Sequence, residues 1–161
     1  MEVLWAPWRM EYILTEGKET CCIFCTDDNS ACDEERLILH KGKNTIVMMN
    51  KFPYVNAHLL VAPHKHCQGL DMLSDEERLD LINMVSIATE ILKKAFCPEG
   101  FNVGLNLGKV AGAGVEEHMH FHIVPRWYGD SNFMTVLADV RVIPQHIRET
   151  YMKLKPYFKD L

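Results

Sequence analysis

Three histidines recur at every second position in one short segment of the chain. They are His118, His120 and His122, and the intervening Met119 and Phe121 are apolar. Alternate side chains of a β-strand share one face, so the imidazoles would line one face while the apolar residues enter a core. A row of imidazoles on a rigid strand can bind a metal, attack an electrophile or transfer a proton.

The spacing of these histidines limits the chemistry. On a straight strand, at about 3.3 Å per residue, His118 and His122 would lie roughly 13 Å apart. Zinc–nitrogen bonds are only about 2 Å long, so three such imidazoles cannot easily meet at one metal ion. The spacing favours a division in which one histidine serves a metal and the others do chemistry. The alternative interpretation is purely structural: the histidines lie on the open face of a strand, in contact with solvent, and have no function.

The composition is that of one globular domain. The 161 residues are 48% hydrophobic and 24% charged, which suffices for a sizeable core. The net charge of −5 argues against a broad nucleic-acid-binding surface. No apolar run approaches the roughly 20 residues that span a bilayer, and the first residues lack the pattern of a secretory signal. We therefore expect a cytoplasmic protein without nucleic-acid or membrane partners.

The cysteines point to metal binding or to free thiols. The chain has six cysteines, and without an export signal a disulfide scaffold is not favoured. Cys22 and Cys25 form a Cys-x-x-Cys motif, the ligand spacing of tetrahedral zinc sites. A redox pair and two buried thiols are the alternatives that the motif alone leaves open.

Three strands are predicted upstream of the histidines. Residues 37–40 and 45–50 are apolar runs on either side of a Lys-Gly-Lys turn at 41–43. Residues 58–62 form a third apolar run, which ends at Pro63.

A long helix is predicted next. Ser74 and Glu77 have the spacing of a capping box, which begins a helix that we expect to run to about Phe96. Apolar residues recur along it at helical spacing, and we expect them to face the core. They are Leu79, Ile82, Val85, Ala88, Leu92 and Ala95.

The remaining pattern completes an α+β domain. Residues 101–107 alternate as a fourth strand, 108–114 are a glycine-rich loop, and the histidine strand follows. Pro144 is expected to open a final helix, within residues 143–161, that reaches about Phe158. The order of elements predicts a single domain over residues 1–161 with a largely antiparallel sheet. Its first 20 residues are rich in aromatic side chains and are expected to be an arm that packs on the core or on a partner subunit.

The histidine segment resembles the signature of the histidine triad (HIT) superfamily of nucleotide hydrolases and transferases. Residues 50–63 are similar to the segment that precedes the long helix of that family, and the resemblance covers roughly residues 22–127. Leu4-Trp5-Ala6-Pro7-Trp8-Arg9 and Pro125-Arg126-Trp127 look like one branch of it, the diadenosine polyphosphate hydrolases and phosphorylases. The resemblance implies a five-stranded antiparallel sheet with two helices, usually in a homodimer.

The resemblance also implies catalytic roles. His120 would be the nucleophile that attacks the α-phosphorus of a nucleotide and forms a covalent nucleotidyl-histidine, which water or phosphate then resolves. His122 would donate a hydrogen bond to the phosphate and stabilise developing charge. His58 would be a supporting donor near the nucleophile.

A structural zinc ion is implied as well. In many HIT proteins the cysteine pair binds zinc together with two histidines, one just past the third strand and one that opens the triad. The matching positions here are Cys22, Cys25, His66 and His118. His64 is an alternative to His66, and Cys21 is an alternative to Cys22.

The resemblance assigns substrate contacts less directly. Asn50 matches an asparagine at the nucleoside pocket, and Asn106 would contact the α-phosphate or the scissile region, although turn or strand-end capping is the alternative for both. Gly112 and Gly114 would supply backbone amides to phosphate. Trp127 would cover the site or stack on a second base, or else lie in a dimer interface.

One stretch departs from the family. Just before the triad, HIT proteins often carry Gln-Ser or Gln-Thr in contact with phosphate, whereas residues 113–115 here are Ala-Gly-Val. Backbone N–H groups would have to replace those side chains. Arg126 is a further candidate for phosphate, or for an ion pair with Glu116 or Glu117.

The sequence thus predicts an enzyme that cleaves dinucleoside polyphosphates at the α-phosphate. A nucleoside phosphoramidase and a nucleotide-binding or scaffolding HIT protein are the alternatives. A plain zinc-binding module would leave His120 and His122 unexplained.

Overall fold

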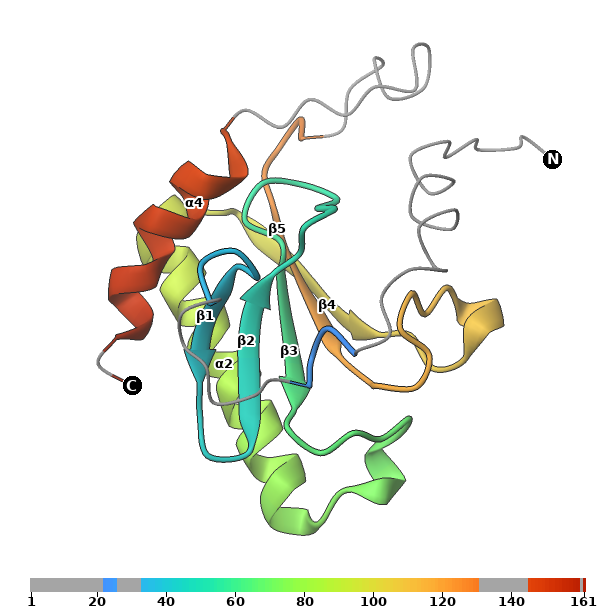
Figure 1. The fold of residues 1–161 in the computed structure, drawn as a ribbon. Helices are drawn as coiled ribbons and strands as arrows, with labels where there is room; N and C mark the ends of the chain where they lie inside the picture. Colours follow the sequence, from blue (N-terminus) through green and yellow to red (C-terminus); the bar gives the residue numbers. More distant parts are fainter. Residues whose placement is uncertain (1–21, 26–32, 131–144, 160) are drawn as a thin grey trace, which may run out of the picture.

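The computed structural model describes residues 22–25, 33–130, 145–159 and 161 (Figure 1). The expected aromatic arm, Cys21 and Pro144 lie outside these residues. The strands are β1 (Ile38–Lys41), β2 (Thr45–Met49), β3 (Leu59–Pro63), β4 (Gly100–Leu105) and β5 (Phe121–Arg126). The α-helices are α2 (Asp75–Phe96) and α4 (Ile147–Leu154), and short 3-10 helices are η2 (Leu70–Met72), η3 (Lys109–Ala111) and η4 (Lys155–Phe158).

The five strands form one sheet in the order β1-β2-β3-β5-β4, and every neighbouring pair is antiparallel. Helix α2 lies across one face, and α4 packs beside it towards the β1 edge (Figure 1). This confirms the expected five-stranded antiparallel sheet with two helices. None of the described helices is long and apolar enough to cross a membrane.

Strand alternation divides the apolar residues between the two faces of the sheet. Val47 and Val61 face the main core under α2, where Met119 and Ile123 also lie. The intervening residues of β2 and β3 form a smaller cluster on the opposite face with Phe24. That second cluster consists of Phe24, Ile38, Ile46, Met48, Leu60 and Ala62.

Helix α2 begins and ends as predicted, but its buried face differs. The Ser74 hydroxyl accepts from the Glu77 N–H, and the Glu77 carboxylate accepts from the Ser74 N–H, which completes the capping box. Leu79 and Ile82 are 63% and 51% exposed, so their predicted place in the core is wrong. Leu81 is buried instead, and at 100° per residue it lies about 200° round the helix from Leu79.

The predicted strand through the three histidines is also too long. Strand β5 begins at Phe121, so His118 and His120 precede it and only His122 lies in the sheet. Pairing with β3 runs from Leu59 to Val61, and Pro63 has no N–H with which to continue it. The Met119 N–H instead donates to the Cys67 carbonyl, at 2.7 Å.

Other predicted boundaries shift by a few residues. Strand β4 ends at Leu105 rather than at 107, and the glycine-rich loop contains the short helix η3. The final helix begins at Ile147 rather than at Pro144, and it tightens to 3-10 geometry from Lys155. Pro156, which cannot donate a backbone hydrogen bond, accounts for that change.

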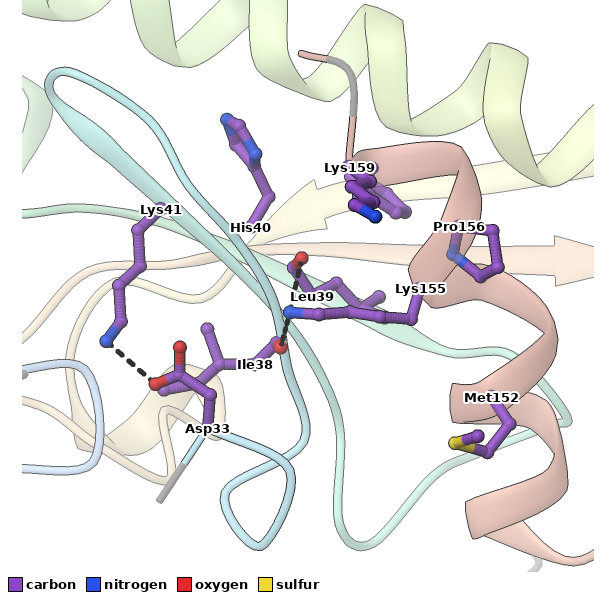
Figure 2. Close-up of a pocket in the computed structure, with 10 residues that line it drawn as sticks. Asp33, Ile38, Leu39, His40, Lys41, Met152, Lys155, Pro156 and Lys159 are labelled. Atoms are coloured by element: carbon purple, nitrogen blue, oxygen red, sulfur yellow. Dashed lines mark hydrogen bonds and ion pairs between the residues drawn. The ribbon is translucent and has the colours of Figure 1, made fainter. Parts of the chain in front are cut away.

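The C-terminal helices cover the edge of the sheet at β1. The Lys155 ammonium donates to the carbonyls of Ile38 and Leu39, at 2.9 and 3.0 Å (Figure 2). The Tyr151 hydroxyl donates to the Ile38 carbonyl as well. A cavity of about 560 Å³ opens beside these contacts, and none of the predicted site residues lines it.

Candidate functional site

The loop between β2 and β3 shapes the first part of the site. The Asn50 N–H donates to the His58 carbonyl at 2.9 Å and closes the loop, while the Asn50 side-chain oxygen accepts from the Phe52 N–H. Ala57 has a positive φ of 58°, a strained conformation for a residue with a Cβ. The strained turn places His58 fully buried beside β5.

The position of the ring proton on His58 follows from its donors. The Tyr54 backbone N–H donates to His58 Nδ1 at 3.2 Å, and the Asn50 side-chain amide lies 3.3 Å from the same atom. Because a backbone N–H can only donate, Nδ1 must be unprotonated, and neutral His58 carries its proton on Nε2. The Tyr54 ring stacks on His58 with centroids 4.8 Å apart.

The proton on His58 Nε2 determines which nitrogen of His122 is protonated. His58 Nε2 lies 3.0 Å from His122 Nδ1 and donates to it, so His122 carries its own proton on Nε2. Burial, with a smaller contribution from His120, lowers the pKa of His122 to about 4. Near pH 7 His122 is therefore a neutral hydrogen-bond donor rather than a cation.

His120 has the opposite arrangement. Its Nδ1 lies 3.0 Å from the His118 carbonyl, which can only accept, so Nδ1 is protonated and Nε2 carries a lone pair. Burial lowers the pKa of His120, which is 5% exposed, and keeps the ring neutral. Its centroid lies 4.9 Å from that of His122. A ring with an unprotonated nitrogen and a ring with an N–H donor thus lie side by side, an arrangement that could serve nucleophilic attack.

The structure adds an aromatic neighbour that the sequence reasoning missed. The ring of Phe24 lies 4.7 Å from that of His120 and 5.2 Å from that of His118, between centroids. Its only signal in the sequence is its place between the two cysteines of the Cys-x-x-Cys motif.

A second group of side chains lies next to the imidazoles. Their ligand atoms all lie within 4.8 Å of one another. A tetrahedral zinc ion with bonds of about 2.0–2.3 Å needs ligand atoms roughly 3.3–3.8 Å apart, so the cluster is close to that size. The four residues are Cys22, Cys25, His66 and His118.

The donor atoms of the cluster suit a metal ion. Cys25 Sγ lies 3.2 Å from His66 Nδ1, and Cys22 Sγ lies 3.3 Å from His118 Nδ1. His118 is fully buried, and its Nε2–H donates to the Pro63 carbonyl at 2.8 Å, which leaves the Nδ1 lone pair facing the thiols. Such an outer hydrogen bond commonly orients a ligating histidine. His64 contacts the Gly42 carbonyl instead, at 2.9 Å.

The predicted substrate contacts lie in other arrangements. The Asn106 side chain donates to the Gly112 carbonyl at 3.3 Å, and the Gly112 N–H donates to the Lys109 carbonyl at 3.0 Å. Both groups therefore hold the loop that precedes the triad, in which Gly114 also lies. The Asn50 side chain is engaged with His58 and the Phe52 N–H, as described above.

Trp127 and Arg126 follow the other end of β5. Trp127 is five residues beyond His122, roughly 16 Å along the strand, so the fold does not bring it to the imidazoles of its own chain. Arg126 pairs with Asp130, with one contact at 2.7 Å, and donates to Asn102 at 2.8 Å. Arg126 thus pairs with Asp130 and Asn102, and its contact with phosphate stays a prediction.

Comparison with known proteins identifies the family of this chain. The HIT domain family matches residues 33–128. This chain belongs to the HIT family. It is 37% identical over 163 residues to the AP-4-A phosphorylase of Mycobacterium tuberculosis, across 93% of this chain and 80% of that protein. It is 33% identical to the adenosine 5'-monophosphoramidase of Schizosaccharomyces pombe, across 65% of this HIT chain and 74% of that protein.

The solved structures show the same fold. A Zn-bound histidine triad family protein from Mycobacterium smegmatis superposes with a TM-score of 0.65 at 22% identity. The match covers 86% of this HIT chain and 94% of that one.

Proposed function

We propose that this HIT protein is an enzyme that cleaves dinucleoside polyphosphates at the α-phosphate through a covalent nucleotidyl-His120. The observation that carries the proposal is the pair of adjacent rings with opposite tautomers, a lone pair on His120 Nε2 and a proton on His122 Nε2. The likeness to an AP-4-A phosphorylase along most of both chains supports this choice of substrate.

The two steps follow from these atoms. His120 Nε2 attacks the α-phosphorus, the bond to the bridging oxygen breaks, and the nucleoside polyphosphate leaves with the electron pair. The His122 N–H hydrogen-bonds to phosphate oxygen and stabilises the charge that develops there. Water or phosphate then attacks the nucleotidyl-histidine and restores His120. His58 holds His122 in the required tautomer.

We propose further that Cys22, Cys25, His66 and His118 hold a structural zinc ion. The donor set of two thiols and two imidazoles matches closed tetrahedral sites, which carry no open position for substrate. When bound, zinc would supply a fixed link between the residue 22–25 turn and His118, whose own carbonyl orients His120.

We also propose that the whole chain, residues 1–161, is one cytoplasmic HIT domain that forms a homodimer. In the described part of the sheet β4 pairs only with β5, and Asn102, Val103 and Gly104 are exposed along it. A second copy would cover this edge. Trp127 would then contribute to the interface or to the site of the partner. Asn50, Asn106, Gly112 and Gly114 remain candidates for substrate contact.

A second candidate function is a nucleoside phosphoramidase. The likeness to an adenosine 5'-monophosphoramidase favours it, because the same attack by His120 would break a P–N bond instead of a P–O bond. The two activities differ in the leaving group and share the nucleotidyl-histidine.

Incubation of the purified protein with diadenosine tetraphosphate, with and without inorganic phosphate, tests the proposal. AMP and ATP as products indicate hydrolysis, whereas ADP and ATP that form only with phosphate indicate phosphorolysis. The name of the mycobacterial relative favours the second outcome. Failure to cleave under either condition, together with cleavage of adenosine 5'-monophosphoramidate, would replace the proposal by the phosphoramidase.

A further inference from the structure

Phe24 is the one aromatic residue of the residue 22–25 turn, and it is 1% exposed. Its ring lies 4.7 Å from the His120 ring, between centroids, at an interplanar angle of 30°. This is a tilted ring contact, and aromatic pairs in contact prefer particular relative orientations. The side chain therefore touches the proposed nucleophile directly.

The other contacts of His120 do not by themselves fix the orientation of its ring. Its hydrogen bond to the His118 carbonyl fixes Nδ1, but the ring can still rock about that bond. His122 approaches it at 4.9 Å between centroids and at 60°, a more open contact. A flat apolar surface against the ring limits the remaining motion. The direction of the Nε2 lone pair then depends on where Phe24 lies.

The turn that carries Phe24 is held at several points. The Cys25 N–H donates to the Cys22 carbonyl at 3.2 Å, and the Arg36 guanidinium donates to the Ile23 carbonyl at 2.6 Å. The two thiols flank Phe24 and face His66 and His118. The cysteine cluster and the Phe24 ring are thus parts of one short rigid element.

We propose that Phe24 is a positioning residue for His120, and that the Cys-x-x-Cys turn serves to hold its ring against the nucleophile. This inference rests on the proposed function, because it assigns His120 the attack on phosphorus. It gives the cysteine cluster an indirect part in catalysis, through the position of the Phe24 ring, beyond any contribution to stability.

The test replaces Phe24 with leucine, which keeps apolar volume but removes the flat ring. We expect kcat with diadenosine tetraphosphate to fall roughly 10- to 100-fold, because a small misplacement of a reacting atom carries a cost of this size. KM should stay within about twofold, since the lost contact acts on the transition state. Zinc content per chain, measured in parallel, should be unchanged.

Ile46→Val is the matched control. Ile46 is fully buried in the same apolar cluster as Phe24, but its aliphatic side chain offers no flat ring to stack on a histidine. Its kcat should stay within about twofold of wild type. The proposal is overturned if Phe24→Leu keeps kcat, if Ile46→Val loses as much, or if Phe24→Leu loses its zinc. Phe24→Met replaces the first variant if that one does not fold.

A spectroscopic measurement separates this inference from the proposed function. In the wild-type protein without substrate, the ring current of Phe24 should shift the carbon-bound ring protons of His120 upfield, and Phe24→Leu should remove that shift. Unchanged His120 signals would overturn the positioning role whatever the substrate. A wild-type protein that shows the shift but cleaves no diadenosine tetraphosphate would instead overturn the proposed function alone.

Discussion

His120 and His122 carry identical side chains, yet their hydrogen bonds place the ring protons on opposite nitrogens. The carbonyl of His118, two residues earlier, holds the proton of His120 on Nδ1, and His58 holds that of His122 on Nε2. Burial lowers the pKa of both rings, so both stay neutral near pH 7. One ring can then attack while the other donates, without any change of charge beforehand.

Replacement of His120 tests the nucleophile. His120→Asn keeps a polar side chain but has no basic nitrogen, so the cleavage rate should fall by at least about 10³-fold. Product formation is measured by chromatography, and circular dichroism checks the fold. His64→Asn is the control, because His64 contacts the Gly42 carbonyl away from the site. Turnover near the wild-type rate in His120→Asn would contradict the assignment.

The lowered pKa of His122 predicts a pH-dependent stability. The folded protein binds a proton at His122 only near pH 4, whereas the unfolded chain binds it near the ordinary value of 6.5. Stability from this group is therefore fully present above about pH 6.5, and it falls as the pH falls towards about 4. The free energy of unfolding, measured with urea along this range, should decline more steeply for wild type than for His122→Gln.

Both proteins in that comparison keep the four side chains of the metal cluster. The difference between their slopes therefore isolates His122 from any release of metal by acid. Equal slopes would show that His122 titrates normally in the folded protein.

At the scale of elements, the residue 22–25 turn and the segment before β5 act together. Neither belongs to the sheet, yet they meet at the cysteine cluster and at the contact of Phe24 with His120. His118 takes part twice, through its ring in the cluster and through its carbonyl on His120. The proposed metal site and the proposed nucleophile are therefore adjacent parts of one structure.

Removal of the metal tests the proposed link between the residue 22–25 turn and the segment before β5. Protein purified without added metal should contain about one zinc per chain, and Cys25→Ser should lose it. Loss of the ion should lower stability by at least about 2 kcal/mol, or a Tm decrease of roughly 4–8 °C for a chain of this size. Metal analysis and thermal unfolding provide the two measurements. Under about 0.2 zinc per chain in wild type, or full retention in Cys25→Ser, would count against the site.

At the scale of the molecule, the two edges of the sheet differ. Lys155 and Tyr151 donate to the carbonyls at the β1 edge, which blocks the addition of another strand. In the described structure β4 has no such cover, and Val103 on it is 44% exposed. An open edge with an apolar side chain is a place where a second copy can pair.

The dimer predicted at β4 is tested by light scattering after gel filtration. The chain has a mass of 18.6 kDa, so the wild-type particle should have twice that mass. Val103→Lys places a charge at the proposed interface and should shift the equilibrium towards the monomer. Met152→Lys, on the 62% exposed Met152 beside the covered β1 edge, should remain dimeric. A monomeric wild type, or no effect of Val103→Lys, would contradict this interface.

Much of the local structure could be predicted from the sequence because it depends on short-range spacing. The capping box at Ser74 and the end of α2 near Phe96 follow from neighbouring residues, and the antiparallel sheet follows from the order of the elements. The predictions that were wrong concern features that depend on segments distant in the sequence. Leu79 is exposed and Leu81 is buried, although both are apolar residues of the same helix, and only the position of the sheet selects which face of α2 is covered.

The candidate site shows the same limit. By itself, the sequence determined the types and spacing of the reactive residues, from the alternating histidines to the Cys-x-x-Cys motif. Only the tertiary structure decided which nitrogen of each imidazole is protonated and which histidine faces the thiols. His120 depends on a carbonyl only two residues away, but the other partners are far along the chain: His58 lies 64 residues from His122, and Cys22 lies 96 residues from His118. A hydrogen bond acts over about 3 Å, so only the folded chain brings such partners within reach.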